Sequence, residues 1–118
     1  MKILLVDDEK IGRDSLQALL STCNFEVETA ADGPQALDIA KRFLPDVVVI
    51  DWMLGQQMDG LGLANALHES QPSARIVIIS GHSDVRNSAP PDAPYGFLMK
   101  PFQLAELLGL FGDEEGHI

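Results

Sequence analysis

The chain has little cysteine, few basic residues and no long apolar run, and each shortage excludes a class of protein. The single cysteine, Cys23, cannot form an internal disulfide, which suits a reducing cytoplasm, and its spacing from nearby leucines predicts a buried helix residue. Eight Lys and Arg against 18 Asp and Glu give a net charge of −10, which argues against nucleic acid or an anionic membrane as a direct partner. No apolar run approaches the roughly 18 residues of a membrane-spanning helix, and the N-terminal run is too short for a signal peptide.

What the chain does contain is the composition of one ordinary globular domain. Its 118 residues, 46% hydrophobic and 22% charged, suffice for one buried core but not two, so we expect a single domain over residues 1–118. The run Val47 to Ile50 is β-branched throughout and has no polar face, which is typical of a strand buried on both sides of a parallel sheet.

Strand and helix patterns alternate five times along the chain, which predicts the α/β fold class. We expect a doubly wound, five-stranded parallel sheet (flavodoxin-like, order 2-1-3-4-5) with helices on both faces. The predicted strands are residues 3–6, 25–29, 47–50, 74–79 and 95–99, with the second at an edge, and the first and last helices are residues 10–23 and 102–111. Prolines between Ser83 and Pro94 allow at most one or two helical turns, so the fourth helix is expected to be short or irregular.

Functional groups follow four of the predicted strands. Asp7 and Asp8 follow the first strand, Asp51 ends the third, Ser80 the fourth, and Lys100 follows the fifth. In a parallel sheet these ends lie at one edge, so the side chains are expected to converge. Carboxylates crowded together without a His or Cys cluster favour binding of Mg²⁺. The ammonium of Lys100 and the hydroxyl of Ser80 complement a phosphoryl group. Together they indicate formation of an aspartyl phosphate.

These motifs resemble the receiver domain of bacterial response regulators over nearly the whole chain. They are Asp7-Asp8, the buried run into Asp51, Ser80-Gly81-His82 and the segment from Phe97 to Phe102. The resemblance implies a signalling switch, with self-catalysed phosphoryl transfer and autodephosphorylation, rather than a metabolic enzyme. Its phosphoryl group would come from a phosphohistidine of a sensor histidine kinase or a histidine phosphotransfer domain. Its output would pass to a downstream protein, or to an output domain not present in this chain.

The resemblance also implies residue roles. Asp51 would be the phospho-acceptor and a Mg²⁺ ligand together with Asp8 and the Met53 backbone carbonyl, with Asp7 acting through water. Lys100 would bind the phosphoryl oxygens, Ser80 and Phe97 would be the switch residues, and the Lys100–Pro101 peptide bond would be cis.

Two alternatives remain at this stage. One is a protein-interaction module of the same fold that does not depend on phosphate, which the complete acidic, serine and lysine set disfavours. The other is a Mg²⁺-dependent phosphohydrolase, which needs a second Asp two residues after the nucleophile, where this chain has Met53. The chain also departs from the family pattern at Gly55, where a proline is usual.

Overall fold

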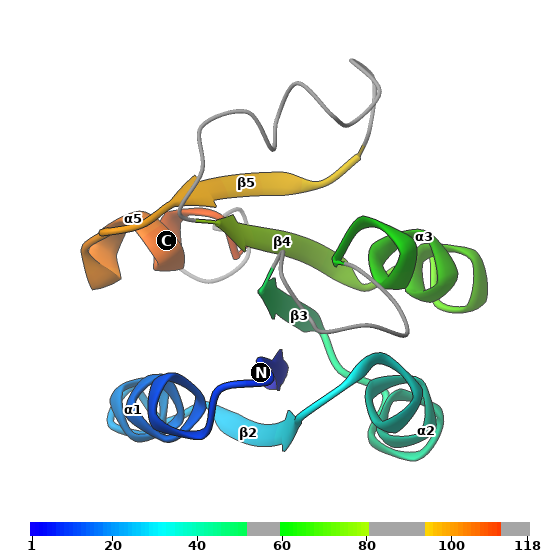
Figure 1. Ribbon diagram of the computed structural model, residues 1–118, viewed down its shortest axis with the longest axis horizontal. Coiled ribbons are helices and arrows are strands. Elements are labelled where there is room, and N and C mark those ends of the chain that lie inside the picture. The colour runs from blue at the N-terminus through cyan, green and yellow to red at the C-terminus, as the bar shows by residue number, and fades with distance from the viewer. Residues whose placement is uncertain (52–59, 81–93, 112–118) are drawn as a thin grey trace.

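The computed structural model of the protein describes residues 1–51, 60–80 and 94–111. A parallel sheet of five strands in the order β2-β1-β3-β4-β5 forms its centre (Figure 1). The strands are β1 (Lys2–Val6), β2 (Glu26–Ala30), β3 (Val47–Asp51), β4 (Arg75–Ser80) and β5 (Gly96–Met99). The described helices are α1 (Lys10–Ser21), α2 (Gly33–Phe43), α3 (Gly60–Ser70) and α5 (Leu104–Gly109). This arrangement confirms the predicted doubly wound topology, with β2 at an edge.

The two faces of the sheet carry two separate apolar cores. Successive strand side chains point to opposite faces, so each buried run serves both cores in alternation. Helices α2 and α3 lie on one face of the sheet and α1 and α5 on the other (Figure 1). In β3, Val48 and Ile50 pack in the core under α2 and α3, whereas Val47 and Val49 pack in the core with α1 and α5 residues. A strand buried on both sides needs no polar face, which explains the uninterrupted β-branched run.

Capping hydrogen bonds from side chains fix where helices α2 and α5 begin. The Asp32 side chain accepts a hydrogen bond from the Gln35 backbone N–H at 2.8 Å, and Pro34 occupies the first turn of α2. The Glu106 carboxylate accepts a hydrogen bond from the Gln103 backbone N–H at 2.8 Å, so α5 begins at Leu104, two residues later than predicted.

The prediction that Cys23 is a buried helix residue is wrong. Helix α1 ends at Ser21, and Cys23 lies half-buried in the following turn. The Thr22 hydroxyl donates to the Leu19 carbonyl at 2.6 Å, and Asn24 adopts a left-handed conformation with φ of 66°. Both features direct the chain out of the helix before Cys23 can join its apolar face.

The expected irregular fourth helix falls almost entirely on residues 81–93, which lie outside the described ranges. Within those ranges, no helix is long and apolar enough to cross a membrane.

Candidate functional site

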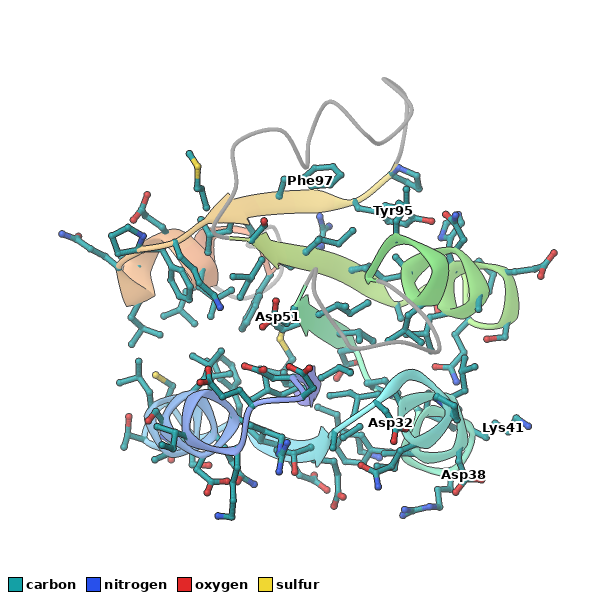
Figure 2. The ribbon with its side chains drawn as sticks, in the orientation of Figure 1. Asp32, Asp38, Lys41, Asp51, Tyr95 and Phe97 are labelled. Carbon is teal, nitrogen blue, oxygen red and sulfur yellow. The ribbon has the colours of Figure 1, made fainter. Side chains whose placement is uncertain are left out.

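The strand register brings the predicted site residues to one edge of the sheet. Val6 of β1 lies opposite Ile50 of β3, and Asp51 lies opposite Ile79 of β4. The carboxyl ends of these strands therefore meet, and Asp51 lies at the end of the central strand (Figure 2). This edge is where open parallel sheets bind their ligands.

Three carboxylates form a cluster at this edge. Oxygen atoms of Asp7, Asp8 and Asp51 all lie within 4.8 Å of one another. Asp8 is exposed, whereas Asp7 and Asp51 are half-buried. The Asp7 carboxylate accepts a hydrogen bond from the Glu9 backbone N–H at 2.9 Å, which fixes it at the start of the turn into α1.

The surroundings of Asp7 disfavour its charged form. Burial raises the pKa of the Asp7 carboxyl above its ordinary value, and the negative charge of Asp51 raises it further. The Glu9 N–H and the charge of Lys100 act in the opposite direction without cancelling the rise. A cation between the carboxylates would relieve this strain.

The donor set of the cluster fits Mg²⁺. All three side chains offer hard oxygen ligands, which suit this ion better than they suit zinc. The unfavourable proximity of Asp7 and Asp51 is the electrostatic situation that a bound divalent ion offsets. Met53, whose backbone carbonyl the resemblance adds to the ligands, lies outside the described ranges.

Lys100 brings a positive charge to the carboxylate of Asp51. Its Nζ lies 3.5 Å from Asp51 Oδ2, and its backbone N–H donates to the Ser80 carbonyl at 2.8 Å. The Lys100–Pro101 peptide bond is cis, as the resemblance implies. Ser80 is 1% exposed at the end of β4, beside Met99 of β5, so the structure places the serine and the lysine on neighbouring strand ends.

Phe97 lies away from the acidic cluster. It is half-buried in β5, opposite Ile78, and packs against the core under α2 and α3 (Figure 2). The switch role of Phe97 therefore stays a prediction.

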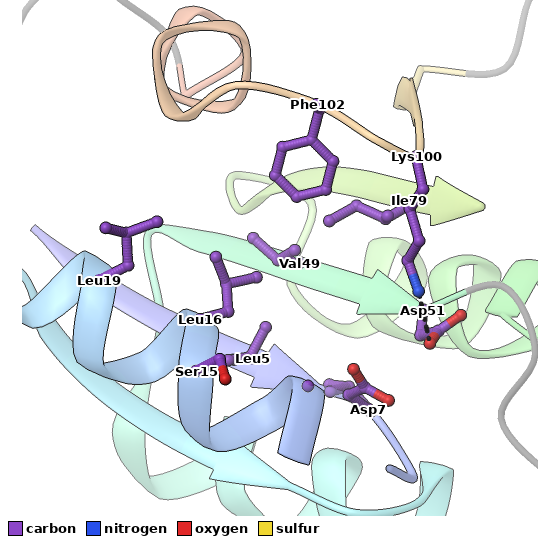
Figure 3. Close-up of a pocket in the computed structure, with 12 residues that line it drawn as sticks. Leu5, Asp7, Ser15, Leu16, Leu19, Val49, Asp51, Ile79, Lys100 and Phe102 are labelled. Atoms are coloured by element: carbon purple, nitrogen blue, oxygen red, sulfur yellow. Dashed lines mark ion pairs between the residues drawn. The ribbon is translucent and has the colours of Figure 1, made fainter. Parts of the chain in front are cut away.

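An apolar cavity adjoins the site on the α1 side of the sheet, and we call it the α1 cavity (Figure 3). Its volume is about 290 Å³. Leu16 and Leu19 of α1, Val49 of β3 and Phe102 line it, and Asp7, Asp51 and Lys100 form its polar end (Figure 3).

Two site neighbours escaped the sequence reasoning. The Arg13 guanidinium Nη1 donates to the Asp7 backbone carbonyl at 2.8 Å. Gly12 leaves the space that the Asp7 carboxylate occupies, because a Cβ at Gly12 would lie 3.0 Å from Asp7 Oδ2. Their positions in the sequence could have placed them near the site, since the first turn of a helix that follows β1 faces the strand ends.

The fold and the site define a doubly wound α/β domain that carries an acidic, lysine-flanked site at the carboxyl edge of its sheet. The sequence matches the response regulator receiver domain family over residues 3–111. The chain belongs to this family, whose members are the receiver domains of two-component systems.

Relatives and solved structures agree with this assignment. The response regulator MprA of Mycobacterium leprae is 36% identical over 110 residues, which cover 92% of this chain and 48% of the relative. An NtrX-like response regulator of Rickettsia bellii is 33% identical over 90% of this chain and 23% of its own length, so the chain spans less than half of these relatives.

Among solved structures, a receiver domain from Clostridium thermocellum superposes with a TM-score of 0.85 at 26% identity, covering 95% of this chain and 91% of that one. A CheY-like receiver domain from Methanospirillum hungatei gives a TM-score of 0.82 at 27% identity, covering 92% and 87%.

Proposed function

We propose that this receiver domain carries a phosphoryl group on Asp51, accepted from a phosphohistidine of a sensor histidine kinase or a histidine phosphotransfer domain. The observation that supports this most is the placement of the Asp51 carboxylate within the aspartate cluster and 3.5 Å from Lys100 Nζ. A carboxylate oxygen attacks phosphorus, the P–N bond breaks, and the imidazole leaves with the bonding electrons and takes up a proton from solvent.

The remaining residues have separate roles in this proposal. Mg²⁺ would be held directly by Asp8, Asp51 and the Met53 carbonyl, and through water by Asp7. The ion would neutralise the negative charge that the carboxylates share with the phosphoryl oxygens. Lys100 binds a phosphoryl oxygen, which its ammonium can reach by leaving Asp51. The Ser80 hydroxyl turns to the phosphoryl group.

The output in this proposal is a conformational switch. Phosphoryl binding favours one of two arrangements of the strand ends, and Phe97 follows because β5 connects it to Lys100. Partners, a downstream protein or an output domain, read the changed surface, and we place this exchange in the cytoplasm.

The test needs no cognate kinase. Phosphoramidate, a small P–N phosphodonor, is added with Mg²⁺ to the wild type, to Asp51→Asn and to Asp38→Asn, an exposed α2 control. We expect a single phosphoryl adduct by intact mass spectrometry in the wild type and in the control, and none in Asp51→Asn. Trp52 fluorescence with Mg²⁺ and then beryllofluoride, a phosphoryl mimic, provides a second readout that Asp51→Asn removes.

Two results contradict the proposal. An adduct that forms equally on Asp51→Asn would place the acceptor elsewhere. No adduct and no response to the mimic in a wild type that is folded by circular dichroism would favour the interaction module that does not depend on phosphate.

A further inference from the structure

The α1 cavity has apolar walls and one charged end. Side chains from α1, three strands and the segment after β5 form it (Figure 3). Its apolar walls include Leu5, Leu16, Leu19, Val49, Ile79 and Phe102. The polar end is shared with the acidic site, because Asp7, Asp51 and Lys100 line both.

The cavity exists because α1 and α5 leave the sheet face between them partly uncovered. Helix α5 has only six residues. On α1, Leu20 is fully buried, but Leu16 is half-buried and Leu19 is 42% exposed, although its helical spacing predicts an inward position. Apolar side chains thus line an opening that no described segment of the chain fills.

The charges at the polar end determine whether a positively charged, negatively charged or neutral ligand binds there. Two carboxylates, Asp7 and Asp51, face one ammonium, Lys100, and Asp8 adds a third carboxylate within 4.8 Å of the other two. Without a divalent ion at the carboxylates, an anion would be repelled here, and a neutral molecule would leave the repulsion between carboxylates unrelieved. A cationic head group would offset it in surroundings where burial strengthens charge–charge attraction.

We infer that the α1 cavity is a binding site for a small organic cation, with an apolar one-ring body against Leu16, Val49 and Phe102 and an ammonium head group at Asp7 and Asp51. The apolar walls provide the favourable burial, and the carboxylates fix the orientation.

The head group and a divalent ion would occupy the same carboxylates. Binding of one therefore weakens binding of the other, by the same factor in both directions. The ligand site itself does not depend on the proposed function, but its regulatory consequence does: a bound cation would inhibit phosphorylation of Asp51 by displacing Mg²⁺.

The test uses three probes that differ in charge: 2-phenylethylammonium, 2-phenylethanol and 3-phenylpropionate. Methyl resonances of Leu16, Val49 and Ile79 are followed during titration of the magnesium-free protein. We expect saturable shifts with the cation, binding about tenfold weaker with the alcohol, since one charge-assisted contact is lost, and none with the anion. Adding Mg²⁺ should reverse the shifts.

A matched pair of variants locates the site. Leu19→Trp places a large ring in the cavity from a position that is already partly exposed, and it should abolish binding of 2-phenylethylammonium. Ile11→Trp makes the same kind of change on the same helix at a residue that is 77% exposed and does not line the cavity, and it should leave binding unchanged. Circular dichroism verifies that both variants fold.

Equal binding of the cation and the alcohol, binding that Leu19→Trp leaves intact, or no methyl shifts would each overturn the inference. The phosphoramidate assay separates this inference from the proposed function. An adduct on Asp51 without cation binding rejects the ligand site alone. Cation binding without any adduct in the ligand-free protein rejects the proposed function alone.

Discussion

Gly12 lies directly against the carboxylate of Asp7: a Cβ at position 12 would approach Asp7 Oδ2 to 3.0 Å. This contact couples the first turn of α1 to the acidic site. A helix interior favours alanine over glycine by up to about 1 kcal/mol, so glycine at this position lowers helix stability. The space that it leaves for the Asp7 carboxylate offers a physical reason for the residue.

The substitution Gly12→Ala should therefore act in opposite directions on folding and on metal binding. The methyl group displaces the Asp7 carboxylate, so we expect several-fold weaker Mg²⁺ binding, while the magnesium-free protein gains up to about 1 kcal/mol in free energy of unfolding. Urea denaturation and Mg²⁺ titration measure the two effects. Gly109→Ala is the matched control, because among the described residues, its own helix backbone and chain neighbours aside, no atom lies within 4 Å of the added Cβ. Unchanged Mg²⁺ affinity in Gly12→Ala would show that Asp7 is not positioned by this contact.

Lys100 should matter for the phosphoryl group rather than for the metal ion. The substitution Lys100→Met removes the charge-assisted hydrogen bond that we propose between Lys100 and the phosphoryl group. Such a bond is worth about 1.5–3 kcal/mol, so beryllofluoride should bind about 10- to 100-fold more weakly. Mg²⁺ should bind at least as tightly as before, since a positive charge 3.5 Å from Asp51 Oδ2 is lost. Lys41→Met, at an exposed position in the last turn of α2, should change neither affinity. A parallel loss of metal and mimic binding would instead indicate a structural role for Lys100.

The fold was predictable because its strongest signals are local and agree with one another. The uninterrupted run Val47 to Ile50 requires a strand covered on both faces, and parallel topology then places Asp7, Asp51 and Lys100 at one edge. The convergence of the acidic site therefore follows from strand order and needs no knowledge of side-chain packing.

The features that escaped prediction depend on packing between distant segments. The exposure of Leu19 reflects how little of the sheet α5 covers, and the role of Arg13 depends on a bond to a backbone carbonyl, which sequence pattern does not encode. Cys23 was misplaced because a side-chain-to-backbone bond and a left-handed residue end α1 early. The role of Met53 stays a prediction, since this residue lies outside the described ranges.

Arg13 should stabilise the turn between β1 and α1. Its hydrogen bond to the Asp7 carbonyl joins the helix to the end of the strand. A hydrogen bond from a charged donor contributes about 1.5–3 kcal/mol when it is shielded from water, and less when it is exposed. Because Arg13 is half-buried, we expect Arg13→Ala to lower the free energy of unfolding by about 1 kcal/mol in urea denaturation. The control Arg42→Ala removes an exposed arginine from the last turn of α2 and should have a smaller effect. Equal losses in both variants would mean that the Asp7 contact adds nothing.

Asp7 should make the metal-free protein less stable as the pH rises. Its pKa is raised in the folded protein, chiefly by burial, so the folded state binds a proton more tightly than the unfolded chain does. Below the ordinary pKa of Asp, Asp7 is protonated in both the folded and the unfolded state, and its burial costs no stability. As the pH rises from that ordinary value through the raised pKa of the folded protein, the free energy of unfolding falls. Above the raised pKa the whole loss of stability is present. Asp7→Asn removes it, so in EDTA the variant should be more stable than the wild type near neutral pH, and the difference should vanish in acid.

Urea denaturation of both proteins at about pH 7 and at about pH 3 measures this difference. Asp14→Asn is a control of opposite sign, because a hydrogen bond from Lys10 lowers the pKa of Asp14; this variant should be no more stable than the wild type at neutral pH. Adding Mg²⁺ should then stabilise the wild type more than Asp7→Asn, since a ligand that binds only the folded state raises its stability by an amount that grows with the logarithm of its affinity for the site. If Asp7→Asn gains nothing in EDTA at neutral pH, the burial of Asp7 carries no electrostatic penalty. The acidic cluster would then need no cation to balance it.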